Sequence, residues 1–164
     1  METSTNGISL IKHFEGTKLT AYADPRGIYT ISTGCIRIDG RSVKKGDVIT
    51  QAKADSMLAE ELEAFEGKLT KMLGKVVITQ SQWDALISFS FNLGSGALGG
   101  STLLKKVLAN PNDPSIADEF PKWRNKGTNF ELGLLTRRLS EYHLYSTGKL
   151  DFDFAAEAKK IMGK

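Results

Sequence analysis

The stretch His13-Phe-Glu-Gly-Thr-Lys-Leu-Thr-Ala-Tyr-Ala-Asp-Pro-Arg-Gly-Ile-Tyr-Thr-Ile31 places two acids and a hydroxyl where a helical pattern gives way to β-rich sequence. Glu15 follows an apolar helical face, Asp24 begins a turn, and Thr30 lies in a β-rich run. Hydrolysis of a glycosidic bond needs one acid to protonate the leaving oxygen and one carboxylate to activate water on the opposite face of the sugar. Glu15 and Asp24 are therefore candidates for such a pair, provided that the turn folds the chain back.

Each of these residues also has a purely structural explanation. Glu15 could be a surface carboxylate at a helix end. That position is mildly disfavoured for a glutamate, because a helix C-terminus carries partial negative charge, and the same dipole favours the neutral carboxyl that a general acid requires. Asp-Pro commonly initiates turns, which accounts for Asp24, and strand propensity accounts for Thr30. The three residues by themselves leave both interpretations open.

The sequence around this stretch predicts a short helix followed by a β-rich segment. Residues 4–14 have a partly helical apolar stripe, and Gly16 is a natural helix stop. Residues 17–49 contain three β-rich runs separated by turns. The segment 36–43 predicts a hairpin, because its central Asp39-Gly40 pair suits a two-residue primed turn.

A long helix is predicted over residues 51–73, with Thr50 as its cap. Its apolar residues recur at spacings of three and four, which is the period of one buried face. The acids of this helix are expected on its solvated side rather than around a metal ion; they are Asp55, Glu60, Glu61, Glu63 and Glu66.

The rest of the chain predicts helices separated by glycine and proline. The predicted segments are a helix after the capping box Thr79-Gln-Ser-Gln82, a helix from Ser101 to Leu108, a helix from Ser115 toward Trp123, and helices over 132–146 and 153–162. We therefore expect one α+β domain, residues 1–164. Its small β-sheet lobe (about 17–49) would be joined by the long helix to a larger all-helical lobe (about 74–164 with the N-terminal helix). A cleft between two such lobes is the expected ligand site.

Composition narrows the function classes. The 164 residues carry 22 basic and 19 acidic side chains, a net charge of +3, with no long basic run, so nucleic-acid binding is not expected. The single cysteine, Cys35, forms no intrachain disulfide, and with the distant His13 and His143 it gives no metal-ligand spacing. We expect neither a metal nor another cofactor.

The first residues lack the basic and apolar regions of a signal peptide, and no apolar run approaches membrane-spanning length. The sequence therefore predicts that the chain folds and remains in the cytoplasm, without stable membrane insertion, until another factor releases it.

Three motifs, in order over about residues 8–146, resemble the phage-type lysozymes (endolysins). The first is Phe14-Glu-Gly-x-x-Leu-x-Ala-Tyr-x-Asp24 with Gly27-x-x-Thr-Ile31. The second is Gln82-Trp-Asp-Ala-Leu-Ile-Ser-Phe-Ser-Phe-Asn-Leu-Gly94 with Ser101-Thr-Leu-Leu-Lys105. The third is Lys122-Trp123 with Gly133-Leu-x-x-Arg-Arg-x-x-Glu141. Three motifs in sequence are much more specific than the spacing of the triad alone.

The resemblance implies a lysozyme-like fold with its active site in the cleft between the lobes. It implies that Glu15 is the general acid and that Asp24, helped by Thr30, holds the attacking water. The reaction would be inverting hydrolysis of the β-1,4 bond between N-acetylmuramic acid and N-acetylglucosamine in peptidoglycan, lysing the bacterial host. By the same resemblance Arg138 pairs with the catalytic glutamate.

The resemblance also implies that Phe91 and Asn92 face the saccharide. Each of these three supporting residues has an ordinary alternative role. Arg138 could be a surface or helix-end arginine, Phe91 a core aromatic and Asn92 a helix-end amide. The family interpretation further implies release through a membrane lesion made by a holin, and we expect a monomer.

The chain departs from the family pattern after Thr30. Phage-type lysozymes commonly continue Thr-Ile-Gly-Tyr-Gly-His, whereas this chain reads Thr30-Ile-Ser-Thr-Gly-Cys35. Replacing a glycine by Ser32 affects local strand geometry or the fit of the sugar more than the acid–base chemistry. Cys35 is either a small buried hydrophobe or a redox-sensitive thiol.

Two other functions compete with hydrolysis. A non-catalytic peptidoglycan-binding or localisation module is one, suggested by the altered segment 32–35, although an intact triad argues against it. Membrane damage by the basic C-terminal segment, 154–164, is the other. That segment is short and weakly amphipathic, so docking onto the helical lobe is the expected outcome.

Overall fold

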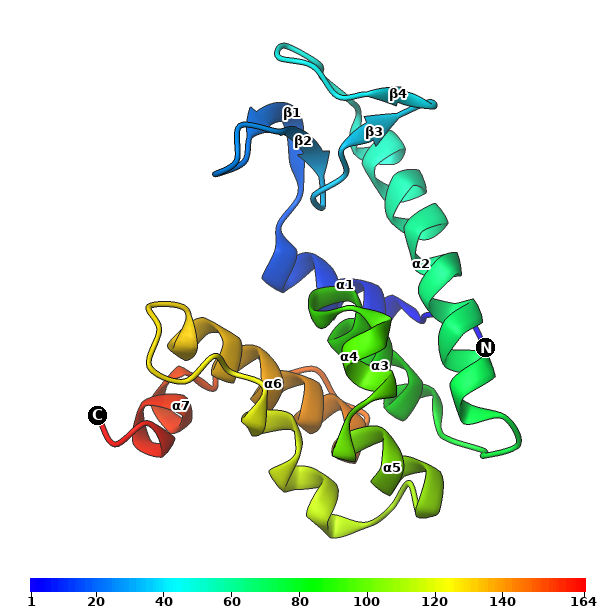
Figure 1. The fold of residues 1–164 in the computed structure, drawn as a ribbon, viewed down its shortest axis with the longest axis vertical. Coiled ribbons are helices and arrows are strands. Elements are labelled where there is room, and N and C mark those ends of the chain that lie inside the picture. Colours follow the sequence, from blue (N-terminus) through cyan, green and yellow to red (C-terminus); the bar gives the residue numbers. More distant parts are fainter. The chain divides into compact units, whose positions relative to one another are not determined.

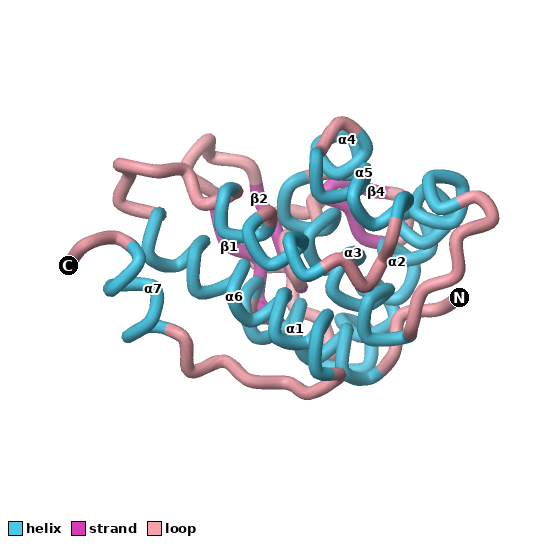
Figure 2. The backbone as a smooth tube through the Cα atoms, turned by 90° about the horizontal axis from the view of Figure 1, so that it is seen from below, coloured by secondary structure: helices cyan, strands magenta, loops and turns pink.

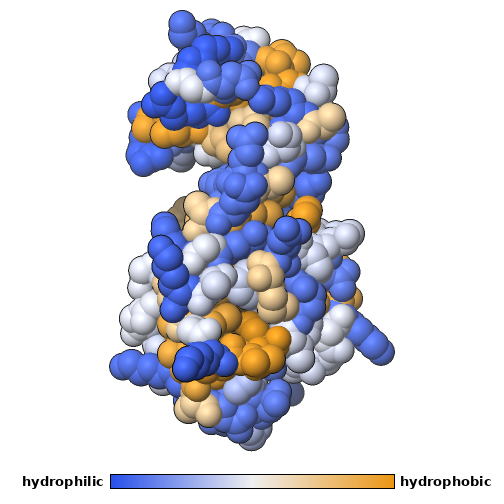
Figure 3. Space-filling model, turned by 90° about the vertical axis from the view of Figure 1, so that its right-hand side faces the viewer, coloured by the Kyte–Doolittle hydropathy of each residue, from blue (hydrophilic) through white to orange (hydrophobic).

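The computed structural model describes all residues, 1–164, and contains two compact units. One unit, Ile11–Ala64, contains every β-strand and is called the β-bearing unit; the other, Met1–Leu10 with Phe65–Lys164, is called the helical unit. Figures 1 and 2 show that helices dominate the chain and that the strands are short. None of the helices has the length and apolar character needed to cross a membrane. Polar residues cover most of the face shown in Figure 3, with separate apolar patches between them.

The first helix ends where the sequence predicts. Helix α1 spans Thr5–Glu15, so Glu15 is its last residue. Gly16 adopts a positive φ of 71°, and its N–H donates to the Lys12 carbonyl at 3.0 Å. This left-handed glycine satisfies one of the helix's last carbonyls and turns the chain into the first strand.

The β-bearing unit contains two separate antiparallel pairs rather than one sheet. Strand β1 (Lys18–Ala23) pairs with β2 (Tyr29–Ser32), with an irregular register between Lys18 and Tyr22. The predicted hairpin is confirmed: β3 (Arg37–Ile38) pairs with β4 (Arg41–Ser42). Its turn residues Asp39 and Gly40 have φ values of 47° and 79°, as a primed turn requires.

Helix α2 spans Gln51–Leu73, which are the predicted bounds. Thr50 caps it, because the Lys53 N–H donates to Thr50 Oγ1 at 3.1 Å. Its N-terminal half contributes Met57 to a small core with Ile31, Ile38 and Val43. The prediction that all acids of this helix are solvated is wrong for two of them, since Glu61 and Glu66 are half-buried.

The helical unit is built around α3 (Gln80–Leu93), whose residues 82–90 are all buried. The Thr79–Gln82 capping box is present, with both reciprocal hydrogen bonds. The other helices of this unit are α4 (Ser95–Gly99), α5 (Thr102–Ala109), α6 (Glu131–Thr147) and α7 (Ala155–Ile161).

The helix predicted from Ser115 toward Trp123 is corrected by the structure. The segment forms two short 3₁₀ helices, η1 (Pro114–Asp118) and η2 (Phe120–Lys122), and Asp113 rather than Ser115 supplies the cap. Pro121 explains the break, because proline has no N–H to donate and its ring clashes with the preceding helical turn.

The C-terminal segment docks onto its own unit, as predicted. Ala158 of α7 is fully buried and forms a small apolar cluster with Leu135 and Leu139 of α6. Phe154 and Met162 pack against the same cluster. Three apolar side chains of this segment are therefore already packed against α6, which argues against direct membrane damage.

Ser32 is one of the departures from the family pattern, and its backbone conformation shows how the chain accommodates a side chain at this position. It has a positive φ of 59°, is only 2% exposed, and its hydroxyl donates to the Ala54 carbonyl at 3.3 Å. A side chain costs energy in this left-handed conformation, and glycine removes that cost. We expect Ser32→Gly to be more stable than Ser32→Ala by about 0.5–1 kcal/mol, because both lose the hydroxyl and only glycine relieves the strain.

Urea unfolding of the two variants and the parent measures this difference in the free energy of unfolding. Equal stability of the two variants, or a more stable alanine variant, would show that backbone strain at this position is negligible.

Candidate active site

Glu15 is half-buried and is followed at once by the Gly16 reversal. The preceding turn of α1 is fixed to α2, because Lys12 Nζ forms an ion pair with Asp55 Oδ1 at 2.7 Å. Lys12 and Glu15 are three residues apart, so they share one face of the helix. Glu15 therefore lies at a fixed point in the β-bearing unit rather than on a loose helix end.

Asp24 follows β1 and organises the turn to β2. Its Oδ1 accepts the backbone N–H groups of Arg26 and Ile28, both at 2.9 Å. Its Oδ2 accepts Arg26 Nε at 3.0 Å and Nη2 at 2.8 Å. The Ile28 amide and then the Arg26 side chain lower the pKa of Asp24 below its ordinary value of 3.8, so the carboxyl stays ionised at neutral pH.

These four donors limit what else the Asp24 carboxylate can bind. A carboxylate has about four lone-pair positions, and the turn occupies all of them. To hold or deprotonate a water molecule, Asp24 must release part of its contact with Arg26. That release is easy, since the Arg26 side chain is 73% exposed and a surface ion pair of this kind contributes little.

Thr30 lies opposite Tyr22 in the register of β1 and β2. Its side chain is buried, and its hydroxyl donates to the Tyr22 carbonyl at 3.3 Å. The hydroxyl proton is therefore used in the hydrogen bond to Tyr22, whereas the hydroxyl oxygen has lone pairs that can accept another hydrogen bond. Thr30 can therefore orient a water molecule as an acceptor.

The β1–β2 hairpin links Asp24 and Thr30, and Glu15 belongs to the same unit. All three residues of the predicted triad thus lie in the β-bearing unit. Their catalytic roles stay predictions.

The three supporting residues belong to the helical unit. Phe91 is half-buried near the end of α3, and its ring packs against Phe65 with the centroids 5.3 Å apart. Asn92 Oδ1 accepts Arg138 Nη2 at 2.9 Å, which fixes the orientation of the Asn92 amide. The contacts of Phe91 and Asn92 with saccharide, and the pairing of Arg138 with Glu15, stay predictions.

Arg138 also belongs to a buried network between α3 and α6. Glu141 Oε1 accepts Ser88 Oγ at 2.8 Å, Arg137 Nε at 3.1 Å and Arg138 Nη2 at 3.0 Å. Two guanidinium groups therefore share one buried carboxylate. The Arg-Arg-x-x-Glu motif thus forms an internal unit in which Glu141 positions both arginines.

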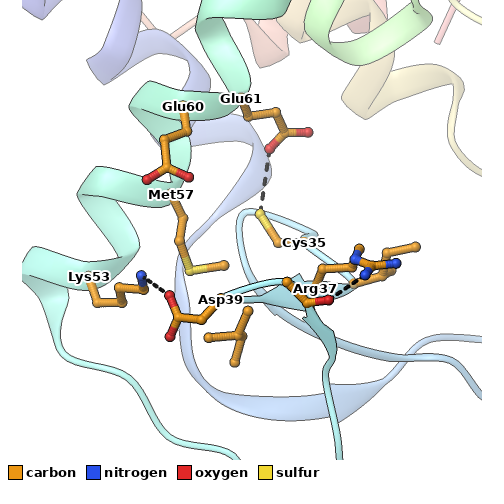
Figure 4. Close-up of a pocket in the computed structure, with 10 residues that line it drawn as sticks. Cys35, Arg37, Asp39, Lys53, Met57, Glu60 and Glu61 are labelled. Carbon is orange, nitrogen blue, oxygen red and sulfur yellow. Dashed lines mark hydrogen bonds and ion pairs between the residues drawn. The ribbon is translucent and has the colours of Figure 1, made fainter.

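Sequence reasoning missed a contact between Cys35 and Glu61. Ile31 and Cys35 exchange backbone hydrogen bonds of 2.9 and 2.8 Å, which reverses the chain and points Cys35 at α2. Cys35 Sγ then lies 3.6 Å from Glu61 Oε2 (Figure 4). The signal was available, because Glu61 follows the buried Met57 by four residues and so shares its helix face.

Burial and the nearby Glu61 charge raise the pKa of Cys35 to about 11. The thiol therefore stays protonated at physiological pH, which disfavours its reaction as a thiolate. No group of three or more His, Cys, Asp or Glu side chains is arranged to hold a metal ion.

A helical unit with a buried central helix, together with a β-bearing unit that carries Glu15, Asp24 and Thr30, defines a lysozyme-like α+β fold. Comparison with known proteins agrees. The family model described as phage lysozyme matches residues 12–141. The endolysin of Salmonella phage P22 is 40% identical over 146 residues, which are 88% of this chain and 98% of that protein.

Two solved structures give the same result. An endolysin from Escherichia coli O157:H7 phage FAHEc1 has a TM-score of 0.82 and 37% identity, over 92% of this chain and 97% of that one. The muramidase domain of SpmX from Asticaccaulis excentricus has a TM-score of 0.75 and 31% identity, over 89% of this chain and 98% of that one. The chain spans 56% of the length of two matching Bacillus phage endolysins. The chain belongs to the phage lysozyme family and is a glycoside hydrolase of the lysozyme class.

The Asp24 turn yields a pH prediction. Arg26→Met removes one cause of the low pKa of Asp24 and leaves the two backbone amides, so this pKa rises partway to its ordinary value. A group with a lowered pKa loses its charge only as the pH falls through that value. The acidic limb of the pH–activity profile should therefore move to higher pH, by about a few tenths of a pH unit because the ion pair is exposed.

The matched control is Arg41→Met, which removes the same charge from the Arg41–Asp47 ion pair of the same unit. It should leave the acidic limb in place. A shift of the same size in both variants would mean that net charge, rather than contact with Asp24, sets that limb.

Proposed function

We propose that this chain is an inverting muramidase that hydrolyses the β-1,4 bond between N-acetylmuramic acid and N-acetylglucosamine in peptidoglycan. As an endolysin it would lyse the bacterial host. Membership of the phage lysozyme family and the likeness to a muramidase domain support the substrate class. The observation that carries the mechanism is the turn at Asp24, whose hydrogen bonds hold that carboxyl in its charged form.

The surroundings of Asp24 favour the ionised state that a base requires. Asp24 accepts two amides and a guanidinium, all of which favour its charged form. Glu15 ends α1, is half-buried and is followed at once by the Gly16 reversal. An inverting glycosidase needs one acid and one base, so the proposal assigns the acid to Glu15 and the base to Asp24.

In the proposed reaction Glu15 gives its proton to the glycosidic oxygen as the bond to the anomeric carbon breaks. A water molecule attacks that carbon from the opposite face, oriented by Thr30, and its proton passes to Asp24. One displacement inverts the configuration of the anomeric carbon. Inverting glycosidases hold their two carboxyls about 6.5–9.5 Å apart to accommodate this water.

The remaining parts of the proposal concern the supporting residues and delivery. Phe91 and Asn92 would contact the saccharide, and Arg138 would pair with Glu15 while Glu141 holds its guanidinium. The protein would act as a monomer, accumulate in the host cytoplasm and reach the wall through a holin-made lesion. The retained triad favours catalysis over a binding module, because binding alone needs neither carboxyl.

Glu15→Gln should abolish turnover without unfolding the protein, since it removes only the transferable proton. A general acid contributes roughly 100-fold or more, so a residual rate above about a tenth would contradict its role. Release of reducing ends from purified peptidoglycan measures the rate, and circular dichroism checks the fold. Glu63→Gln, on the exposed side of α2, is the matched control and should retain full activity.

The stereochemistry tests the mechanism separately. Proton NMR of a defined peptidoglycan glycan, recorded before mutarotation, should show the α anomer as the first product. An initial β anomer would establish retention through a covalent intermediate. A 1,6-anhydro-muramic end would establish a lytic transglycosylase, in which no water attacks.

A further inference from the structure

The hairpin of β1 and β2 has two faces, and its two tyrosines lie on opposite ones. Side chains alternate between the faces along a strand, and residues that are opposite each other in the ladder share a face. Tyr29 packs against the small core of the β-bearing unit, together with Ala21 and the fully buried Ile31. Tyr22 pairs with Thr30 on the other face and is 41% exposed. The Tyr22 face is therefore the outer face of the hairpin.

The backbone pairing continues beyond the last residue of β1, as far as Asp24. The Asp24 N–H donates to the Ile28 carbonyl at 2.9 Å, so the two chains remain paired into the turn. A step of two residues returns a side chain to the same face of a strand. Asp24 follows Tyr22 by two residues, and Ile28 precedes Thr30 by two. The two residues that would hold the attacking water thus share the outer face with two exposed apolar side chains, Tyr22 and Ile28.

Tyr22 lies beside both residues of the proposed water site. Cβ atoms directly opposite each other in a ladder are about 4.5–5.5 Å apart, and residues two apart along a strand are about 6–7 Å apart. The Thr30 hydroxyl donates to the Tyr22 carbonyl at 3.3 Å, which holds the two strands in contact at this point. A sugar placed against a water molecule between Asp24 and Thr30 is therefore within reach of the Tyr22 ring.

A pyranose has the kind of surface that an exposed tyrosine ring binds. The C–H bonds on the face of a β-linked pyranose carry partial positive charge, and the face of an aromatic ring is negative. Ligand sites commonly combine such an aromatic surface with a few polar groups that fix orientation. A single exposed aromatic residue needs no special explanation. The position of Tyr22 next to Asp24 and Thr30 is what indicates a function.

We propose that Tyr22 is a substrate-binding residue whose ring stacks on the pyranose that the water molecule attacks. The stacked ring would hold the anomeric carbon of that sugar over the water between Asp24 and Thr30. This inference rests on the proposed function, because it requires a glycan substrate and a water molecule at these two residues.

The kinetics of Tyr22→Val test the stacking. Valine keeps a high strand propensity but removes the ring. Binding that is equal in the ground state and the transition state lowers KM without changing kcat. KM for a soluble peptidoglycan glycan should therefore rise about three- to tenfold in this variant, with kcat nearly unchanged. Tyr22→Phe keeps the ring and should keep the parent KM. An unchanged KM in Tyr22→Val would overturn the inference.

Tyr29→Val is the matched control, because it removes a ring from the core face of the same hairpin. It should lower the melting temperature, since Tyr29 packs against the small core, and leave KM at the parent value. Tyr22→Val should show the reverse, because substitutions at exposed positions change stability little. An equal rise of KM in both variants would mean that the integrity of the hairpin, rather than stacking, sets KM, and would refute the inference.

Proton NMR of the Glu15→Gln variant tests the contact without turnover. The probe is a soluble tetrasaccharide of alternating N-acetylglucosamine and N-acetylmuramic acid. The ring protons of Tyr22, assigned by their loss when Tyr22→Val is added, should show nuclear Overhauser effects to sugar C–H protons, whose signals should shift upfield. Binding of the tetrasaccharide without these effects would contradict the inference alone. A complete lack of binding would refute the proposed substrate class and the inference with it.

Discussion

An acid–base glycoside hydrolase needs one protonated and one ionised carboxyl at the same pH, and the local fold provides the ionised one. The turn after β1 directs the amides of Arg26 and Ile28 at Asp24 and fixes it as a carboxylate. Glu15 ends α1 in the same unit and is followed at once by the Gly16 reversal. The base of the proposed reaction thus depends on the directions of a few peptide groups at residues 24–28.

The departure from the family pattern at residues 32–35 also concerns backbone conformation and local hydrogen bonds. Ser32 adopts a left-handed conformation that glycine reaches easily, and a hydrogen bond to the Ala54 carbonyl offsets part of the cost. Cys35 is a donor at a position where the family commonly has histidine, and it directs that donor at Glu61. The two side chains thus hold this turn against α2.

Much of the fold was predictable because local signals agreed with one another. Gly16 ended α1, Asp39-Gly40 formed the hairpin turn, and the period of apolar residues gave the bounds of α2. The segment 114–122 differs from the predicted helix, because Pro121 interrupts the helical run that the Ser115 pattern predicts. Glu61 differs from the predicted solvated face, because it follows the buried Met57 by four residues and so shares its side of α2. The contacts of Asp24 depend on the φ and ψ angles of its turn, which residue types alone do not determine.

The central claim concerns two protonation states, and carbon-13 NMR of protein labelled at its Asp and Glu carboxyls observes both directly. Signals are assigned with Glu15→Gln and Asp24→Asn. At the pH of maximal activity the account predicts a protonated Glu15 and an ionised Asp24 in the same sample. Two ionised carboxyls at that pH, or a proton on Asp24 with a charge on Glu15, would contradict it.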